Sequence, residues 1–237
     1  MELTDANAIK MAPISGGARH FSSSAGTIIT KVDYQSSEMA DVWKAGFALG
    51  MFLEESPLWV RNKRVIELGA GVGYLGILCA KLGAKKVILT DVGELLPVLR
   101  ENVLRNNATQ ALVAELDWGN RDQRRELSMQ KFETILASDC IYEENGIGPF
   151  LRAADAIFTR SIAASITPDG LVAIKLRGCS KDIRTCFLEK ARAIFTVREV
   201  MPVVEDVVTR LEVKDPATPW QQLCIQENVA IYHFRKK

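Results

Sequence analysis

The chain has 237 residues, 48% of them hydrophobic, and a formal net charge of +1 at pH 7. This composition supports one sizeable buried core and excludes global disorder, and the dispersed basic residues exclude a strongly basic nucleic-acid-binding face. Five cysteines without a C-x-x-C pair and only two histidines, His20 and His233, argue against a disulfide framework and a metal centre. The first ten residues carry Glu2 and Asp5 and no apolar run, and no later run reaches membrane-spanning length. We therefore expect a soluble protein of the cytoplasm, with the nucleus as the alternative.

The N-terminal part predicts a hairpin followed by a helix. The stretch HFSSSAGTIITKV (residues 20–32) reads as two short strands that turn at Ala25–Gly26. The stretch SSEMADVWKAGFALGMFLEE (residues 36–55) reads as a helix capped by Ser36 or Ser37. We expect this region, residues 1–60, to be an extension that packs on the main domain.

From residue 61 to residue 237, β-branched runs alternate with helical stretches. The expected strands are residues 64–69, 86–91, 111–117, 132–139 and 171–178, and the expected helices are residues 73–82, 95–107, 121–130, 146–166 and 182–195. This order predicts a doubly wound parallel sheet. Two further strands, 196–200 and 228–236, read as an antiparallel pair at the sheet edge with no helix between them, because the Pro-rich stretch 214–223 reads as a loop.

A glycine-rich turn, ELGAGVGYLG (residues 67–76), follows the first strand of this domain. Gly71, Gly73 and Gly76 fit the pattern G-x-G-x-x-G, which occurs in turns that bind dinucleotides. A turn in the same place can instead hold S-adenosylmethionine. The glycines alone leave both alternatives open.

Four acids at or near the strand ends favour S-adenosylmethionine. Ligands of doubly wound sheets bind beyond the carboxyl ends of the strands, where Glu67, Asp91, Asp117 and Asp139 are expected. Such acids would repel the pyrophosphate of NAD and attract a sulfonium and an ammonium group. One acid after the second strand, here Asp91, suits ribose hydroxyls in either case. Each acid could instead cap the helix that follows it.

Several motifs together resemble class I, seven-strand S-adenosylmethionine methyltransferases. They are ELGAGVG, Asp91, DWG (residues 117–119) and SDCIY (residues 138–142). The D-x-x-Y motif within SDCIY, and Trp43 on the helix before the first strand, resemble the family 16 branch, the non-histone protein-lysine methyltransferases. The resemblance covers most of residues 43–178, and the two strands expected near the C-terminus resemble the two closing strands of the family. Within the turn, Val72 replaces a frequent Thr or Ser, and Tyr74 is bulky.

The resemblance implies a Rossmann-like fold and a division of roles. On the cofactor side, Asp91 would hold the ribose, Trp118 would lie against adenine and Trp43 would close over the cofactor. The full predicted cofactor set is Trp43, Glu67, Gly69, Ala70, Gly71, Gly73, Asp91, Trp118 and Ser138. On the substrate side, Asp139 would bind the amine and Tyr142 would form a wall of its channel.

The implied activity is methylation of a lysine in a protein substrate, by resemblance a chaperone or a translation factor. We expect a monomer with neither nucleic acid nor membrane as partner. The alternatives are a protein arginine or small-molecule methyltransferase, a non-catalytic S-adenosylmethionine-binding interaction module, and a nicotinamide enzyme. The stretch 201–223 matches no motif, and we expect it to take part in choosing the substrate.

Overall fold

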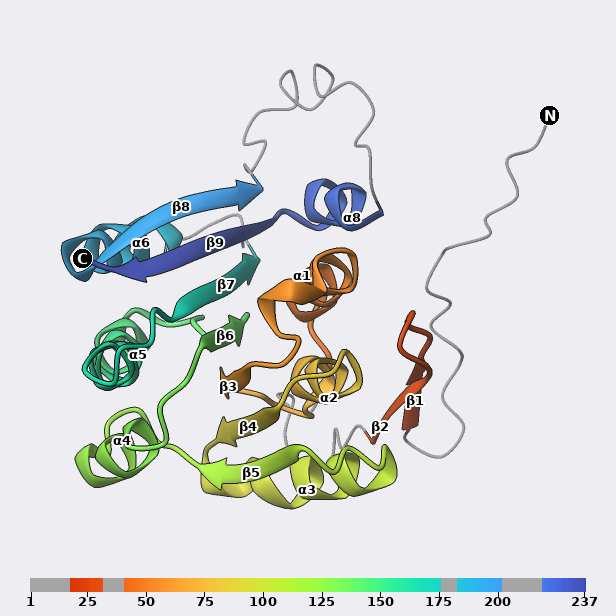
Figure 1. Ribbon diagram of the computed structural model, residues 1–237. Coiled ribbons are helices and arrows are strands. Elements are labelled where there is room, and N and C mark those ends of the chain that lie inside the picture. The colour runs from red at the N-terminus through yellow and green to blue at the C-terminus, as the bar shows by residue number, and fades with distance from the viewer. Residues whose placement is uncertain (1–17, 32–40, 176–182, 202–218) are drawn as a thin grey trace.

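The computed structural model describes residues 18–31, 41–175, 183–201 and 219–237. Its main sheet has seven strands in the order β5-β4-β3-β6-β7-β9-β8 (Figure 1). The strands are β3 (Arg64–Leu68), β4 (Lys86–Asp91), β5 (Ala111–Glu115), β6 (Thr134–Ser138), β7 (Asp169–Lys175), β8 (Phe195–Met201) and β9 (Val229–Lys236). β3 to β7 run parallel, and β9 runs antiparallel to both of its neighbours. The predicted doubly wound sheet with an antiparallel C-terminal pair is confirmed.

The chain reverses its direction of travel across the sheet between β3 and β6. It first moves outward from β3 to β4 and β5, and then returns to the other side of β3 to form β6 and β7. A doubly wound sheet opens a crevice at such a point, beyond the carboxyl ends of the two strands. The glycine-rich turn follows β3 and the D-x-x-Y motif follows β6, so both reach this crevice.

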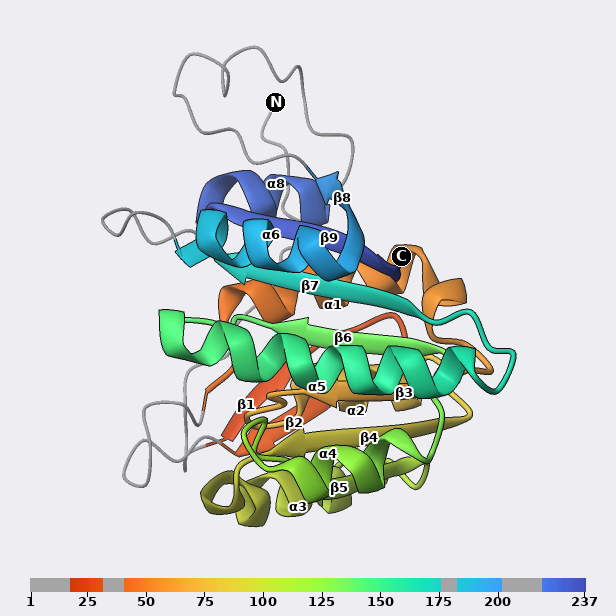
Figure 2. The ribbon, with the colours of Figure 1, turned by 90° about the vertical axis from the view of Figure 1, so that its left-hand side faces the viewer.

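Helices cover both faces of the sheet. They are α1 (Lys44–Glu55), α2 (Tyr74–Lys81), α3 (Leu96–Arg105), α4 (Arg121–Ser128), α5 (Glu144–Ile162), α6 (Ile183–Ile194) and α8 (Pro219–Glu227), with the short 3-10 helices η1 (Pro57–Trp59) and η2 (Gly93–Leu95). Figure 2 shows α4, α5 and α6 in front of the sheet, and α1 and α2 lie on the opposite face. Because both faces are covered, successive residues of β3 are buried in different cores: Val65 packs in one cluster and Ile66 in the other. None of the helices in the described ranges is long and apolar enough to cross a membrane.

The predicted N-terminal hairpin is confirmed as β1 (Ala18–Phe21) and β2 (Ile28–Lys31). It lies outside the main sheet, beside α2 and α3 (Figure 1). Phe21 packs against Phe47 of α1 and Tyr74 of α2, with ring centroids 4.8 and 5.0 Å away. The turn is tied to α1 as well, since Glu54 Oε1 accepts hydrogen bonds from the backbone N–H and the hydroxyl of Ser24 at 2.6 and 2.9 Å.

The helix before β3 begins later than the sequence predicted. Trp43 is extended (φ −80°, ψ 153°), and α1 starts at Lys44. The predicted caps Ser36 and Ser37 lie outside the described residues, as does the end of the strand predicted at 171–178. The late start matters because it leaves Trp43 at the helix entrance rather than on the apolar face of a helix.

The prediction of a loop with no helix between β8 and β9 is wrong. Pro219–Glu227 forms α8, which packs on α1. Trp220 lies edge-on to Phe52 with ring centroids 5.1 Å apart, and its Nε1 donates to Glu55 Oε2 at 2.9 Å. Burial of this indole offsets the weak helical signal of the local sequence. The remainder of the predicted loop, up to residue 218, lies outside the described residues.

Candidate active site

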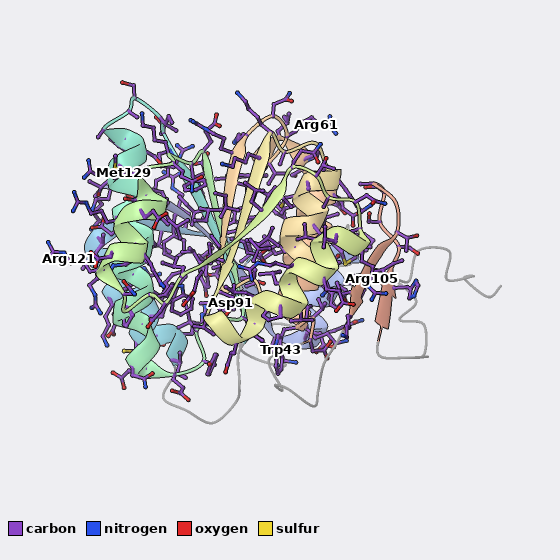
Figure 3. All side chains as sticks on the ribbon, turned by 90° about the horizontal axis from the view of Figure 1, so that it is seen from below. Trp43, Arg61, Asp91, Arg105, Arg121 and Met129 are labelled. Carbon is purple, nitrogen blue, oxygen red and sulfur yellow. The ribbon has the colours of Figure 1, made fainter. Side chains whose placement is uncertain are left out.

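A cleft of about 410 Å³ opens at the carboxyl ends of the central parallel strands. This volume falls in the range of small-molecule sites, roughly 300–1,000 Å³. Figure 3 shows Trp43 and Asp91 at this end of the sheet and Arg61 at the other. Eight of the predicted site residues line the cleft: Trp43, Gly69, Gly71, Asp91, Trp118, Ser138, Asp139 and Tyr142.

The glycine-rich turn brings backbone to the floor of the cleft. Gly69, Gly71 and Gly73 have φ values of +72°, +55° and +86°, a region that L-residues with a side chain adopt only at a cost. At Gly69 a side chain would also collide, because an ideal Cβ would lie 2.6 Å from Cys140 Cβ. Gly69 and Gly71 line the cleft, whereas Ala70 is buried and Gly73 starts α2 behind it.

Asp91, the last residue of β4, holds the turn from one side. Its Oδ2 accepts the N–H of Gly71 at 2.7 Å, and its Oδ1 accepts the N–H of Val92 at 2.8 Å. Burial raises the pKa of Asp91, and these two backbone hydrogen bonds oppose the rise. An ionised carboxylate oxygen can accept more than one hydrogen bond, so Asp91 can also receive a pair of hydroxyls from the cleft.

Trp118 forms an apolar wall of the cleft. Its ring meets Phe150 of α5 edge-on, with centroids 5.2 Å apart and an interplanar angle of 80°. It also lies opposite the turn, since an ideal Cβ on Gly69 would come within 3.3 Å of Trp118 Cζ2. Leu95 and Leu116 extend the same apolar lining. A flat ring system could lie against this wall.

Asp139 and Tyr142 stand on the other side of the cleft, after β6. Asp139 has a left-handed backbone (φ +49°), and the residue is only 6% exposed. Its Oδ1 accepts the N–H of Lys175 at 3.3 Å, at the end of the neighbouring strand β7. Tyr142 is 47% exposed and Trp43 is 44% exposed, so two aromatic rings border the cleft where it meets solvent.

The alternative role of the acids as helix caps is not observed. The N-cap residues of α2, α4 and α5 are Gly73, Asn120 and Glu143, and the residue before η2 is Val92. None of the four acids singled out in the sequence occupies such a position. Asp91, Asp117 and Asp139 instead line the cleft.

Glu67, predicted to lie near the cofactor, is buried inside β3 and does not line the cleft. Burial raises its pKa to about 8, against a backbone hydrogen bond with Gly76 that lowers it, and the charge of Asp91 adds to the rise. Its Oε2 has no hydrogen-bond partner among the described residues. Protonation of Glu67 lowers the cost of burying its side chain, because a neutral carboxyl group costs far less to desolvate than a carboxylate.

The cleft also contains residues outside the predicted site set, among them Asp117, which the sequence singled out only as an acid near a strand end. They are Val92, Leu95, Leu116, Asp117, Cys140, Glu143, Asn145 and Gly146. Half of them, Val92, Leu116, Asp117 and Cys140, lie within two residues of the end of a strand, where the predicted crevice lies. The others lie in η2 or at the start of α5, and no sequence signal pointed to them. Glu143 adds a fourth carboxylate, and no lysine or arginine of the described ranges belongs to the lining. The cleft therefore favours a ligand with positive charge.

The glycine-rich turn, the left-handed Asp139 and the acidic lining of the cleft fit S-adenosylmethionine, the predicted cofactor. No cluster of three metal-ligating side chains occurs in the described residues. Comparison with known proteins agrees. The chain is 34% identical over 166 residues to protein N-lysine methyltransferase METTL21A of Danio rerio, an alignment that covers 68% of this chain and 70% of that protein. It is 39% identical over 105 residues to EEF1A lysine methyltransferase 3 of Xenopus tropicalis, covering 44% of this chain and 45% of that protein.

The fold has relatives among solved structures as well. An rRNA methylase from Streptococcus thermophilus superposes with a TM-score of 0.50 over 81% of this chain and 93% of that chain, at 14% sequence identity. This likeness concerns the fold alone. The family profile described as lysine methyltransferase matches residues 24–190, a span that contains the glycine-rich turn, Asp91, Trp118 and the D-x-x-Y motif. The chain belongs to this lysine methyltransferase family, whose members take the methyl group from S-adenosylmethionine.

Proposed function

We propose that the protein transfers a methyl group from S-adenosylmethionine to the side-chain amine of a lysine in a non-histone protein, with Asp139 and Tyr142 receiving the amine. The observation that carries this assignment is the acidic cleft with an aromatic border. Asp91 ends β4 and Asp139 follows β6, the two strands that flank β3, and the lining contains no cationic side chain of the described residues.

On the cofactor side, the backbone of Gly69 and Gly71 would approach the methionine end closely. Asp91 would accept the ribose hydroxyls, and Trp118 would lie against the adenine. S-adenosylmethionine supplies a methyl group on a positively charged sulfur. An amine can attack the methyl carbon in line and displace the sulfur, without a metal or a covalent enzyme intermediate. The protein's task is then to align a neutral amine with that methyl group.

The substrate amine is the difficult partner. A free lysine has a pKa of about 10.4, so about one in 2,500 is neutral at pH 7, a cost of roughly 4.6 kcal/mol. Asp139 would first bind the ammonium form and fix its position. Desolvation in the cleft and a positive charge on the cofactor would then lower the amine pKa, with water as the proton acceptor. The exposed ring of Tyr142 can contact the amine through its π face.

Methyl transfer into a cell lysate tests the substrate class directly. Tritiated S-adenosylmethionine should label protein, and mass spectrometry of the digest should locate the label on lysine. Label on arginine, or only on small molecules, would overturn the substrate assignment and leave the cofactor site standing. Cofactor binding without any transfer would leave only an interaction module.

Variants at the D-x-x-Y motif test the assigned roles. Asp139→Ala should lower turnover by about two orders of magnitude, about 2.7 kcal/mol, because it removes an interaction with the reacting amine. Asp139→Asn tolerates the left-handed backbone and removes only the charge, so equal loss in both variants would identify charge as the cause. The affinity for S-adenosylhomocysteine, measured by calorimetry, should stay nearly unchanged. Tyr142→Phe should be milder than Tyr142→Ala.

The partner and location are proposed more broadly. A protein substrate follows from the family, and a translation factor is supported by the name of the Xenopus tropicalis relative, which acts on EEF1A. A chaperone is the second candidate class. We propose that the enzyme works as a monomer in the cytoplasm and that the stretch 201–223 contributes to substrate choice. Pull-down with the Asp139→Asn variant, followed by mass spectrometry, would identify the target.

A further inference from the structure

Two buried asparagines, Asn102 of α3 and Asn106 at its C-cap, hold the N-terminal hairpin by its free edge. Asn106 Oδ1 accepts the N–H of Ile29 at 2.8 Å, and its Nδ2 donates to the carbonyl of Ile29 at 2.6 Å. Asn102 Oδ1 accepts the N–H of Lys31 at 2.7 Å, and its Nδ2 donates to the carbonyl of Lys31 at 3.2 Å. Each amide thus makes the pair of hydrogen bonds that a neighbouring strand would make. They are four residues apart, so they lie on one face of the helix.

The two asparagines supply hydrogen-bond partners that the outer edge of the hairpin would otherwise lack. A two-stranded hairpin is marginally stable in water, and its outer edge leaves backbone groups without partners. The ion pair of Lys31 with Glu101, at 3.0 Å, adds a contact at the same place. Figure 3 shows Arg105, near the end of α3, next to the hairpin. The second strand of the hairpin, β2, is therefore fixed to the C-terminal end of α3.

The two asparagines differ in their third contact: Asn106 Nδ2 donates to the carbonyl of Asn102 at 2.7 Å, within its own helix, whereas Asn102 reaches another element. Asn102 Nδ2 also donates to the carbonyl of Val72 at 2.9 Å, inside the glycine-rich turn. Only the amide nitrogen can serve here, because both Val72 and Lys31 present a carbonyl oxygen to it. Asn102 is fully buried, so this bond is shielded from water.

The hydrogen bond from Asn102 to Val72 reaches the glycine-rich turn where its backbone is left-handed. Val72 lies between Gly71 and Gly73, both with positive φ. Asp91, which lines the cleft, accepts the N–H of Gly71 at 2.7 Å, and Asn102 of α3 donates to the carbonyl of Val72. Two peptide groups of the turn, Ala70–Gly71 and Val72–Gly73, are thus fixed by two side chains from two different elements. A glycine turn has many accessible conformations, so these anchors determine which one meets the cofactor.

We propose that Asn102 is a positioning residue for cofactor binding, and that through it the N-terminal hairpin is part of the cofactor-binding apparatus. The hairpin and the turn share one amide group, so order in one stabilises order in the other. By linkage, cofactor binding must then stabilise the hairpin by the same free energy by which the hairpin favours binding. This inference depends on the use of S-adenosylmethionine, and not on which substrate is methylated.

The matched pair Asn102→Ala and Asn106→Ala tests the assignment on the full chain. Each variant loses the two hydrogen bonds to β2, so both should lower the unfolding temperature. Asn102→Ala should weaken S-adenosylhomocysteine binding at least tenfold by calorimetry, which is about 1.4 kcal/mol, whereas Asn106→Ala loosens the hairpin but keeps the Val72 contact and should weaken binding less. Asn102→Ala should also speed amide hydrogen exchange at Gly71 and Gly73 more than Asn106→Ala does. Equal losses of affinity in the two variants, or no loss in either, would reduce Asn102 to a tether of the hairpin.

A measurement on the unchanged protein keeps the inference testable if Asn102→Ala does not fold. S-adenosylhomocysteine should slow amide exchange at Ile29 and Lys31 several-fold more than at the amides of β8, which lies at the far edge of the sheet. Equal slowing in both places, or none in the hairpin, would contradict the coupling. Wild-type protein that fails to bind S-adenosylhomocysteine at all would overturn the cofactor assignment itself, an outcome distinct from failure of methyl transfer.

Discussion

Replacing Gly69 by alanine should damage the site in two separable ways. The left-handed backbone at this residue (φ +72°) costs an L-residue about 1–2 kcal/mol. The new methyl group would also stand 2.6 Å from Cys140 Cβ and 3.3 Å from Trp118 Cζ2. Overpacking of this kind costs typically about 1–3 kcal/mol, so the sum is about 2–5 kcal/mol of unfolding free energy. Cys140 Cβ is bonded directly to the backbone, so relief requires the segment beside Asp139 to move.

The matched control is Gly83→Ala. Gly83 has φ +90° at the end of α2, but an ideal Cβ there meets only Arg61 Cγ at an ordinary 3.6 Å. It should therefore show the backbone cost alone, about 1–2 kcal/mol, and unchanged affinity for S-adenosylhomocysteine. Gly69→Ala should lose more stability in urea titration and bind the ligand at least tenfold more weakly by calorimetry. Equal stability losses, or full affinity in Gly69→Ala, would refute the close approach of the turn to Cys140.

Three further outcomes follow from the site. Asp91→Ala should weaken S-adenosylhomocysteine binding by about 1.5–3 kcal/mol in calorimetry, since hydroxyls and the Gly71 amide lose their acceptor; unaltered affinity would contradict the ribose role. Trp118→Ala should weaken binding by about 1–3 kcal/mol and Trp43→Ala by less, whereas equal destabilisation with no affinity change would make both core residues. In the folded protein the pKa of Glu67 is raised from 4.5 to about 8. Between pH 4.5 and about pH 8 the folded state therefore keeps a proton that the unfolded state loses, and the free energy of unfolding falls by about 1.4 kcal/mol per pH unit. Relative to wild type, Glu67→Gln should therefore gain unfolding temperature as the pH rises through that window, and a constant difference would show that Glu67 is not protonated.

Much of the fold could be predicted because its signals are local. Strands buried on both faces appear as continuous β-branched runs, and the predicted strand at Lys86–Asp91 coincides with β4. The acids Asp91 and Asp139 follow from the same signal, because the end of a parallel strand is also the edge of the binding crevice. The glycine-rich turn after β3 could be predicted because glycine is the residue that a left-handed backbone favours.

The parts that failed depend on partners distant in the chain. Pro219 was read as a loop signal, although proline suits the first turn of a helix, and α8 forms because Trp220 is buried on α1. Glu67 was expected near the strand end, but it lies one residue before the end of β3 and its side chain is buried beside Gly76 of α2 instead of lining the cleft. The contacts of Asn102 and Asn106 had no sequence signal at all, since their partners in β2 lie more than 70 residues earlier and Val72 lies 30 residues earlier.

The place of β9 in the sheet has a consequence for synthesis. β9 lies between β7 and β8, although both precede it in the chain. Gly170–Lys175 of β7 pairs with β9 on one side, and β8 pairs with it on the other. While the ribosome still holds residues 229–236, β8 has no neighbour to join, and the edge of β7 presents unpaired backbone groups. Exposed strand edges invite pairing with other chains. We therefore expect the sheet to be completed late and in one event, and shortening β9 to remove two strand pairings at once.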